Sequence, residues 1–254
     1  MKANEFRPLR EALERGEPQA VHETRKLSRQ IGAELSLDGA PRKARRAWRD
    51  LRRAVAPLRD HDVTGEHITS ALKRLKAPLP EIAQFEQAWA EKRQGLLADL
   101  HLPELPRVPE RPGNFKKKAR SALLKQSQRL QEDAATVLKA SDSVVWHEWR
   151  KALKQYRYTH EVLAPAPKIL KDTLDALGRM QDAEVVLDAV AHDWPHGHQE
   201  ALIKQESGAR NRARRTVQKL WPELNAHFQE VQSRQGKLGK GKPGKSKEPK
   251  PEQP

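Results

Sequence analysis

The sequence HETRKLSRQ at residues 22–30 returns later in the chain as HEWRKALKQ at residues 147–155. Six of the nine positions match in residue type when Arg29 and Lys154 count as equivalent. An internal repeat of this kind constrains the architecture of a chain more than any other single feature. The repeat therefore predicts a protein built from two similar halves.

Both copies place their positive charges on one face of a helix and their apolar side chains on the opposite face. An α-helix turns by about 100° per residue, so residues three and four apart are neighbours on its surface. The two basic stripes consist of His22, Arg25, Lys26 and Arg29 in the first copy, and of His147, Arg150, Lys151, Lys154 and Arg157 in the second. The opposite faces carry Val21, Thr24, Leu27, Ile31 and Leu35, and Val145, Trp146, Trp149, Leu153 and Tyr156. We expect these faces to pack into a core.

A charged stripe on a helix is ordinarily interpreted as a solvated face. Here the stripes favour a polyanion-binding surface instead. Exposed helices usually mix acidic and basic residues at i,i+4 spacing, and acidic residues are nearly absent from these stripes. Arginine binds phosphate through two parallel hydrogen bonds, and lysine supplies a point charge. Histidine adds charge only when it is protonated. If the two stripes face each other, they line a shared groove of positive potential.

The composition limits the class of protein and the kinds of site. The 254 residues carry a net charge of +15, and 36% of them are hydrophobic, which suffices for slender helical bundles. The absence of cysteine excludes disulfides and thiolate zinc sites. No apolar run approaches the roughly 18 residues of a membrane span, and no signal-peptide core is visible. We therefore expect a cytoplasmic protein without a membrane partner, and the excess positive charge indicates an anionic partner.

The segment pattern predicts an all-α fold, because no stretch shows sustained alternation or a hairpin turn. The expected divisions are residues 1–100 as the first helical half, 101–113 as a proline-rich linker, 114–234 as the second half and 235–254 as a disordered basic tail. Within the halves we expect a turn at residues 57–60, a short helix over about 168–178 and a helix break at Pro222. Pro18, Gly39 and Asp142 are expected to mark helix ends.

No catalytic site is predicted. The chain has no glycine-rich phosphate loop, no Gly-x-Ser-x-Gly and no His-Glu-x-x-His. On a helix, the glutamate that follows each repeated histidine points about 100° away from it and does not orient it. Two metal sites are weaker alternatives, formed by His192, His196 and His198 or by Asp60, His61 and Asp62. Exposure explains the first group and helix capping with pairing to Arg59 explains the second, so no metal or cofactor is expected.

Two motifs together resemble the CHAD domain, an α-helical domain named for its histidines. In the first half, His22, Arg25 and Arg29 are followed by LRDHDV at residues 58–63. In the second half, His147, Arg150, Lys154 and Arg157 are followed by MQDAEV at residues 180–185. The resemblance covers about residues 3–232. It implies two antiparallel helical bundles around a pseudo-twofold axis, a basic central cavity, and binding of inorganic polyphosphate without catalysis, at polyphosphate granules.

The candidate polyphosphate site extends beyond the stripes to a second basic helix in each half. In the first half this helix adds Arg42, Arg45, Arg46, Arg49 and Arg52, and in the second half it adds only Lys168 and Lys171. Gly32 stands where the second stripe has Arg157, which is one departure from the repeat. Because the second half offers only two lysines on its second basic helix against the arginines of the first half, the phosphate contacts are expected to favour the first half. The alternative is a nucleic-acid-binding helical protein that uses the same charge, although no helix-turn-helix or zinc finger is recognisable.

Overall fold

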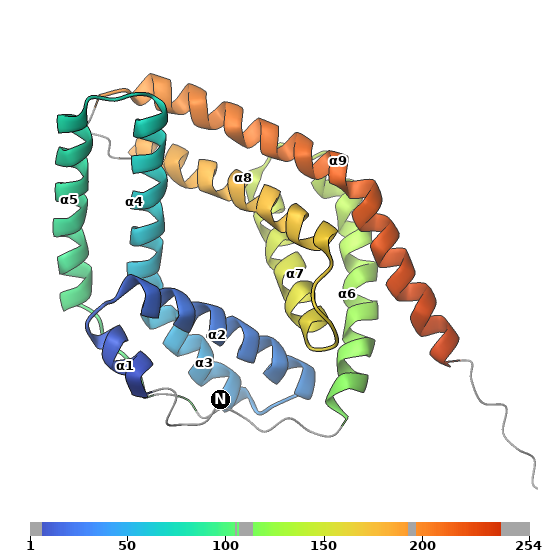
Figure 1. Ribbon diagram of the computed structural model, residues 1–254. Helices are drawn as coiled ribbons and strands as arrows, with labels where there is room; N and C mark the ends of the chain where they lie inside the picture. The colour runs from blue at the N-terminus through green and yellow to red at the C-terminus, as the bar shows by residue number, and fades with distance from the viewer. Residues whose placement is uncertain (1–6, 105, 107–113, 193–196, 240–254) are drawn as a thin grey trace, which may run out of the picture.

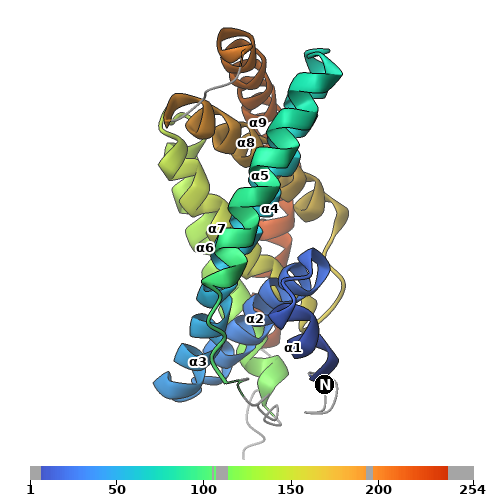
Figure 2. The same cartoon turned by 90° about the vertical axis from the view of Figure 1, so that its left-hand side faces the viewer.

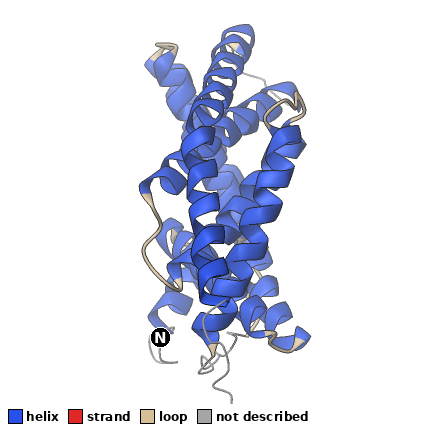
Figure 3. Ribbon diagram, turned by 90° about the vertical axis from the view of Figure 1, so that its right-hand side faces the viewer, coloured by secondary structure: helices blue, strands red, loops and turns tan. Residues whose placement is uncertain are grey.

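The computed structural model describes residues 7–104, 106, 114–192 and 197–239, and these residues form nine α-helices and no strand. The predicted all-α class is confirmed, and Figure 3 shows helices throughout. The helices are α1 Arg7–Glu14, α2 Pro18–Asp38, α3 Arg42–Ala54, α4 Ala56–Arg74, α5 Leu79–Ala98, α6 Phe115–Val137, α7 Ser143–Glu161, α8 Lys168–His192 and α9 Gln199–Gly239. None of the described helices is both long and apolar enough to cross a membrane.

The helices associate as pairs of sequence neighbours, and the pairs follow one another around the molecule (Figure 1). The pairs α2–α3, α4–α5, α6–α7 and α8–α9 each pack along their length. Contacts between the two halves of the chain run from α4 to α8 and α9, and from α2 to α6 and α7. In Figure 2, α5 lies on the outside of α4. The predicted duplication and its twofold axis remain predictions.

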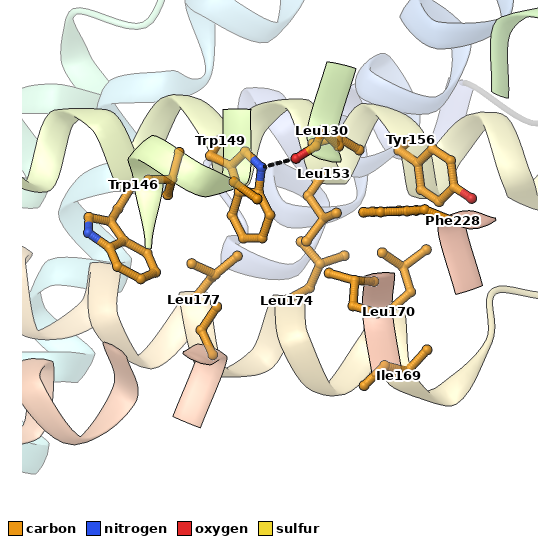
Figure 4. Packing of buried hydrophobic residues seen from close by; sticks show 14 of the residues in the cluster. Leu130, Trp146, Trp149, Leu153, Tyr156, Ile169, Leu170, Leu174, Leu177 and Phe228 are labelled. Atoms are coloured by element: carbon orange, nitrogen blue, oxygen red, sulfur yellow. Dashed lines mark hydrogen bonds between the residues drawn. The ribbon is translucent and has the colours of Figure 1, made fainter. Parts of the chain in front are cut away.

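The helices α6–α9 share one large apolar core. Trp146, Trp149, Leu153 and Tyr156 of α7 are all buried, and Figure 4 shows them in a row that faces Leu170, Leu174 and Leu177 of α8. The indole nitrogen of Trp149 donates a hydrogen bond to the Leu130 carbonyl of α6 at 3.2 Å. This row is the apolar face that the second repeat predicts, so the basic stripe of α7 is directed away from this core.

The core of the first half is divided into smaller clusters, and one of them is shared with the second half. Ile68, Leu72 and Phe85 of α4 and α5 pack against Val190 and Leu202 of α8 and α9. Beside this cluster, Arg74 Nη2 lies 2.6 Å from a carboxylate oxygen of Glu206, whose side chain is 1% exposed. The α4–α5 hairpin is therefore anchored to the second half by both apolar packing and a buried charge.

Three predicted helix ends are confirmed. Pro18 occupies the first turn of α2, where its missing N–H costs nothing. Gly39 ends the same helix in the left-handed conformation, with φ 70°, which glycine adopts without steric strain. Asp142 caps α7 by accepting a hydrogen bond from the Val144 N–H at 2.8 Å.

Three predicted interruptions are wrong. Residues 57–60 are not a turn, because α4 begins at Ala56 and accommodates Pro57 in its first turn. The helix that starts at Lys168 does not stop near Gly178 but continues to His192, since one internal glycine costs only about 1 kcal/mol and the buried face continues past it. Likewise, α9 runs through Pro222 with Val217, Leu224 and Phe228 buried on either side.

The linker and the tail lie mostly outside the described residues. Residues 101–104 and 106 have no helical structure, and residues 105 and 107–113 of the predicted linker are not described. At the other end, α9 continues to Gly239, past the predicted boundary at residue 234, and residues 240–254 are not described.

Candidate functional site

The two basic stripes meet, because α2 packs against α7 with these faces turned toward each other. Six cations are the members of what we call the basic cluster, namely Arg25, Arg29, Arg52, Arg150, Lys154 and Arg157. They come from α2, α3 and α7, so residues more than a hundred positions apart in the sequence contribute to one site.

Arg29 lies at the centre of the basic cluster. Its charge acts on Arg25 of its own helix, on Arg52 of α3, and on both Arg150 and Lys154 of α7. The charge of this one guanidinium therefore acts on cations of three helices. Opposite charges would stabilise this arrangement, whereas the like charges present here repel one another.

Arg25 is held at the edge of the cluster by one carboxylate. Its side chain is only 15% exposed, and its Nη2 lies 3.2 Å from an Oδ1 atom of Asp60 on α4. Its Nη1 is buried and has no hydrogen-bond partner in the described part of the chain. Burial, followed by the charges of Arg29, Arg52 and Arg59, lowers the pKa of Arg25, and Asp60 opposes this shift.

Arg150 occupies the matching place on α7 and lies close to α8. Its Nη2 is 3.7 Å from where a Cβ would stand on Gly178, and its Nε is buried without a partner. Burial is the main cause that lowers the pKa of Arg150, and the Asp182 carboxylate of α8 opposes it. Asp182 also lies 3.1 Å from the Nε2 of His67 on α4.

Lys154 is the most perturbed group of the cluster. Burial, and then the charges of Arg150, Arg29, Arg157 and Arg25, lower the pKa of Lys154 to about 7. Both causes act in the same direction, because each disfavours the protonated amine. No carboxylate among the described residues forms an ion pair with this side chain.

Replacing Lys154 by methionine is expected to stabilise the protein by about 1–2 kcal/mol at pH 7, since solvent screens part of the shift at a partly exposed site. The lowered pKa means that protonated Lys154 is less stable in the folded protein than in the unfolded chain. This destabilisation of the folded state reaches its full value below pH 7. It disappears as the pH rises through the ordinary lysine value near 10.4. Urea unfolding of both proteins at pH 7 and pH 10 measures this difference. A variant that is less stable than the parent at pH 7 would contradict it.

The remaining predicted site residues are not members of the basic cluster. The Nδ1 of His147 lies 2.5 Å from the Gln181 side-chain oxygen, and His22 is exposed. Lys26 pairs with Glu23 at 3.4 Å and Lys151 with Glu148 at 2.6 Å. The outer positions Arg42, Arg45, Arg46, Arg49 and Lys171 are exposed, and Lys168 pairs with Asp172 at 2.5 Å.

The family model of the CHAD domain matches residues 3–191, about three quarters of the chain. The chain belongs to the CHAD domain family. No curated protein and no solved structure matches it. The family assignment agrees with the all-helical fold and with the repeated motifs, which the structure brings together at one place.

Three residues of this CHAD domain that the sequence analysis did not select also border the basic cluster. Arg59 acts on Arg25, and Asp182 acts on Arg150. Both belong to the second repeated motif, so the repeat itself contained the signal. The third is Tyr158, which acts on Arg52 and Arg150 and has its ring 6.0 Å from the Arg157 guanidinium. Tyr158 directly follows Arg157 in the second-half motif, so this motif also contained the signal.

The side chains of the predicted Asp60-His61-Asp62 metal site point to three different partners. Asp60 pairs with Arg25, and the ring of His61 stacks on Trp89 at 4.4 Å. Asp62 lies 2.6 Å from the Nε of Arg93. In the part of the chain that the structure describes, no three histidine, cysteine or acidic side chains are placed to hold a metal ion. His198 pairs with Glu81 at 3.0 Å, and the side chains of His192 and His196 are not described.

A separate groove lies between α8 and α9. It has a volume of about 580 Å³ and is formed by α8 and α9, with Asp172, Asp175, Arg179, Arg212 and Thr216 among its lining residues. Its mixed charge does not suit a polyanion, and it shares no residue with the cluster.

Proposed function

We propose that this CHAD domain binds inorganic polyphosphate at the basic cluster, without catalysing a reaction of the bound chain. The observation that carries the proposal is the convergence of Arg25, Arg29, Arg52, Arg150 and Lys154 from three helices. Guanidinium groups suit phosphate because they donate two parallel hydrogen bonds and carry a permanent charge.

The energetics of the unliganded cluster support the proposal. Like charges held close together in a partly buried site raise the free energy of the folded state. Two buried donors, Nη1 of Arg25 and Nε of Arg150, have no acceptor among the residues that the structure describes. A buried donor without an acceptor costs about 1–3 kcal/mol. Phosphate oxygens supply both the opposite charge and the acceptors.

A repeating polyanion fits the cluster better than a single phosphate does. Cations from α2, α3 and α7 are spread over several turns of helix, at about 5.4 Å for each turn. A chain of linked phosphates contacts several of these positions at once, so the second and later contacts are intramolecular and add to the affinity. A protein that binds polyphosphate accumulates where polyphosphate is concentrated. The proposal therefore includes localisation of the protein to cytoplasmic polyphosphate granules.

Nucleic-acid binding is the second candidate, and the exposed face of α3 favours it. Arg42, Arg45, Arg46, Arg49 and Arg53 are all exposed on this helix, which carries only one acidic residue, Asp50. An exposed row of arginines contacts the phosphates of a duplex without reading its bases.

A competition experiment separates the two functions. Labelled polyphosphate is bound to the protein and displaced by unlabelled polyphosphate, duplex DNA or single-stranded DNA at equal phosphate concentration and physiological salt. We expect polyphosphate to compete at least tenfold more effectively than either nucleic acid, because it carries a negative charge on every repeating unit and has no sugars or bases that must be accommodated beside the half-buried cations. Equal competition by DNA would favour the second candidate.

The affinity for polyphosphate is expected to fall as the pH rises above about 7. Bound phosphate stabilises the protonated amine of Lys154, which is lost in the free protein above a pKa of about 7. Binding at higher pH must therefore take up a proton, which weakens it roughly fivefold between pH 7 and pH 8. Fluorescence titration measures this change. The Lys154→Arg variant, whose charge does not titrate, should show a flatter profile, and an unchanged profile would contradict the assignment.

A further inference from the structure

Lys154 differs in its surroundings from the described lysines that form ion pairs. Lys151, one turn away on the same helix, lies 2.6 Å from the Glu148 carboxylate and is more than half exposed. The side chains of Lys118 and Lys168 likewise contact carboxylates, those of Asp38 and Asp172. Lys154 instead faces guanidinium groups and is partly buried. Among the described residues, no carboxylate forms an ion pair with its amine to oppose the effects of burial and of the neighbouring guanidinium groups.

An amine in such surroundings is a nucleophile at neutral pH. Lysines become nucleophilic when they are desolvated or placed next to other cations. With a pKa of about 7, about half of the Lys154 amines are neutral at pH 7, compared with less than roughly one in a thousand for an ordinary lysine. The same guanidinium groups that suppress its charge also attract anions. An electrophile that carries a phosphate is therefore delivered to the amine.

We propose that Lys154 is a site of covalent acylation by acyl phosphates, with the phosphate of the reagent held by the arginines of the basic cluster. The neutral Nζ attacks the carbonyl carbon, and the bond between this carbon and the bridging oxygen breaks. Its electron pair leaves with inorganic phosphate, and the nitrogen loses one proton to solvent. The products are an acylated lysine and phosphate, so no oxidant or further reactant is needed.

The groups that surround Lys154 and the basic cluster come from five helices, α2, α3, α4, α7 and α8. They are Arg25 and Arg29 of α2, Arg52 of α3, Arg150 and Arg157 of α7, with Asp60 of α4 beside Arg25, and Tyr158 and Asp182 beside Arg150. Each of the two carboxylates acts on an arginine, and neither is among the charges that act on Lys154. The arrangement stabilises the negative charge that develops on the leaving phosphate.

Acylation would regulate the proposed polyphosphate binding, and this consequence rests on the proposed function. The amide that forms carries no charge and fills space between α2 and α7. A polyphosphate chain loses one cation at the centre of the site, and we expect its affinity to fall at least fivefold. Bound polyphosphate in turn shields the amine from reagent.

The test uses the full-length protein with acetyl phosphate at pH 7.5, followed by peptide mass spectrometry. We expect the initial acetylation rate at Lys154 to exceed that at Lys151 at least tenfold. A parallel reaction with the N-hydroxysuccinimide ester of acetic acid delivers the same acetyl group without a phosphate. The preference for Lys154 should be several times smaller with this ester, and Arg29→Gln should reduce the preference seen with acetyl phosphate.

Two results would overturn the proposal. Acetylation of Lys154 no faster than Lys151 would show that the amine is not activated. Equal preference for Lys154 with both reagents would show that the cluster does not guide the phosphate. Polyphosphate affinity is measured on the same unmodified protein, so selective acetylation without polyphosphate binding would refute the proposed function alone. Binding without selective acetylation would refute only the present inference.

Discussion

Replacing Arg25 and Arg150 together by glutamate is expected to lower the affinity for polyphosphate by about a hundredfold or more. A hydrogen bond to a charged group contributes about 1.5–3 kcal/mol, and every 1.4 kcal/mol corresponds to a factor of ten in affinity. Losing two such contacts therefore accounts for the hundredfold change before any repulsion is counted. Both side chains are partly buried, so solvent screens the reversed charges less than at an exposed site. Isothermal titration of the two proteins with polyphosphate measures the effect.

The matched control reverses two exposed arginines and changes the net charge by the same amount. Arg10 and Arg129 lie on α1 and α6, with side chains 37% and 82% exposed, and each pairs with an acidic residue one turn along its own helix. Their replacement by glutamate should cost less than about fivefold, since exposed charges are weak and screened. Equal losses in the two double variants would mean that polyphosphate responds to overall charge and not to the basic cluster. Circular dichroism should show both variants helical.

The helices and their two faces could be predicted because both follow from a local rule. Buried and exposed positions alternate with the period of an α-helix, and a basic stripe is visible wherever that period separates charge from apolar residues. In α7, Trp146, Trp149 and Leu153 are buried as the pattern predicts. The preference of glycine and proline for helix ends gives the wrong result at Gly178 and Pro222. Both helices continue there, because packing of the flanking residues outweighs the local preference for a break.

The composition of the site could be predicted only in part, because the meeting of two helices is a long-range event. The repeat suggests that the two stripes share one site, but it does not show which cation is central, and in the structure Arg29 of α2 acts on Arg52, Arg150 and Lys154. The sequence also does not distinguish the buried cations from the exposed arginines of α3, since both occur on equally basic stripes. Burial is what changes the chemistry of Lys154, and burial depends on contacts between helices.

One motif illustrates how neighbouring residues acquire unrelated roles. In LRDHDV at residues 58–63, Asp60 turns toward Arg25 and the basic cluster. Asp62 instead holds Arg93 of α5, which also donates a hydrogen bond to the Gly16 carbonyl at 2.6 Å. His61 accompanies Asp62, with its ring stacked on Trp89. Consecutive helical residues point about 100° apart, so a single motif serves the site on one side and the α4–α5 hairpin on the other.

The tight packing of this hairpin makes Gly65 sensitive to even a small substitution. A Cβ at residue 65 would lie 2.4 Å from the indole Nε1 of Trp89 and 2.6 Å from its Cδ1. The indole has little freedom to move away, because its Nε1 donates to the His61 carbonyl at 3.0 Å and its ring stacks between His61 and Phe85. Gly65→Ala is therefore expected to destabilise the protein by about 2–3 kcal/mol, as overpacking does in other cores.

Gly95 of α5 provides the matched control, since nothing lies within 4 Å of where its Cβ would stand. Alanine has the higher helix propensity, so Gly95→Ala should stabilise the protein by about 0.5–1 kcal/mol. The two variants make the same chemical change in the same hairpin, and we expect opposite signs. Each kcal/mol corresponds to about 2–4 °C in the melting temperature of a chain of this size, so thermal unfolding resolves both. Stabilisation by both substitutions would show that Trp89 can leave its place, and that the stacked His61 does not fix the hairpin.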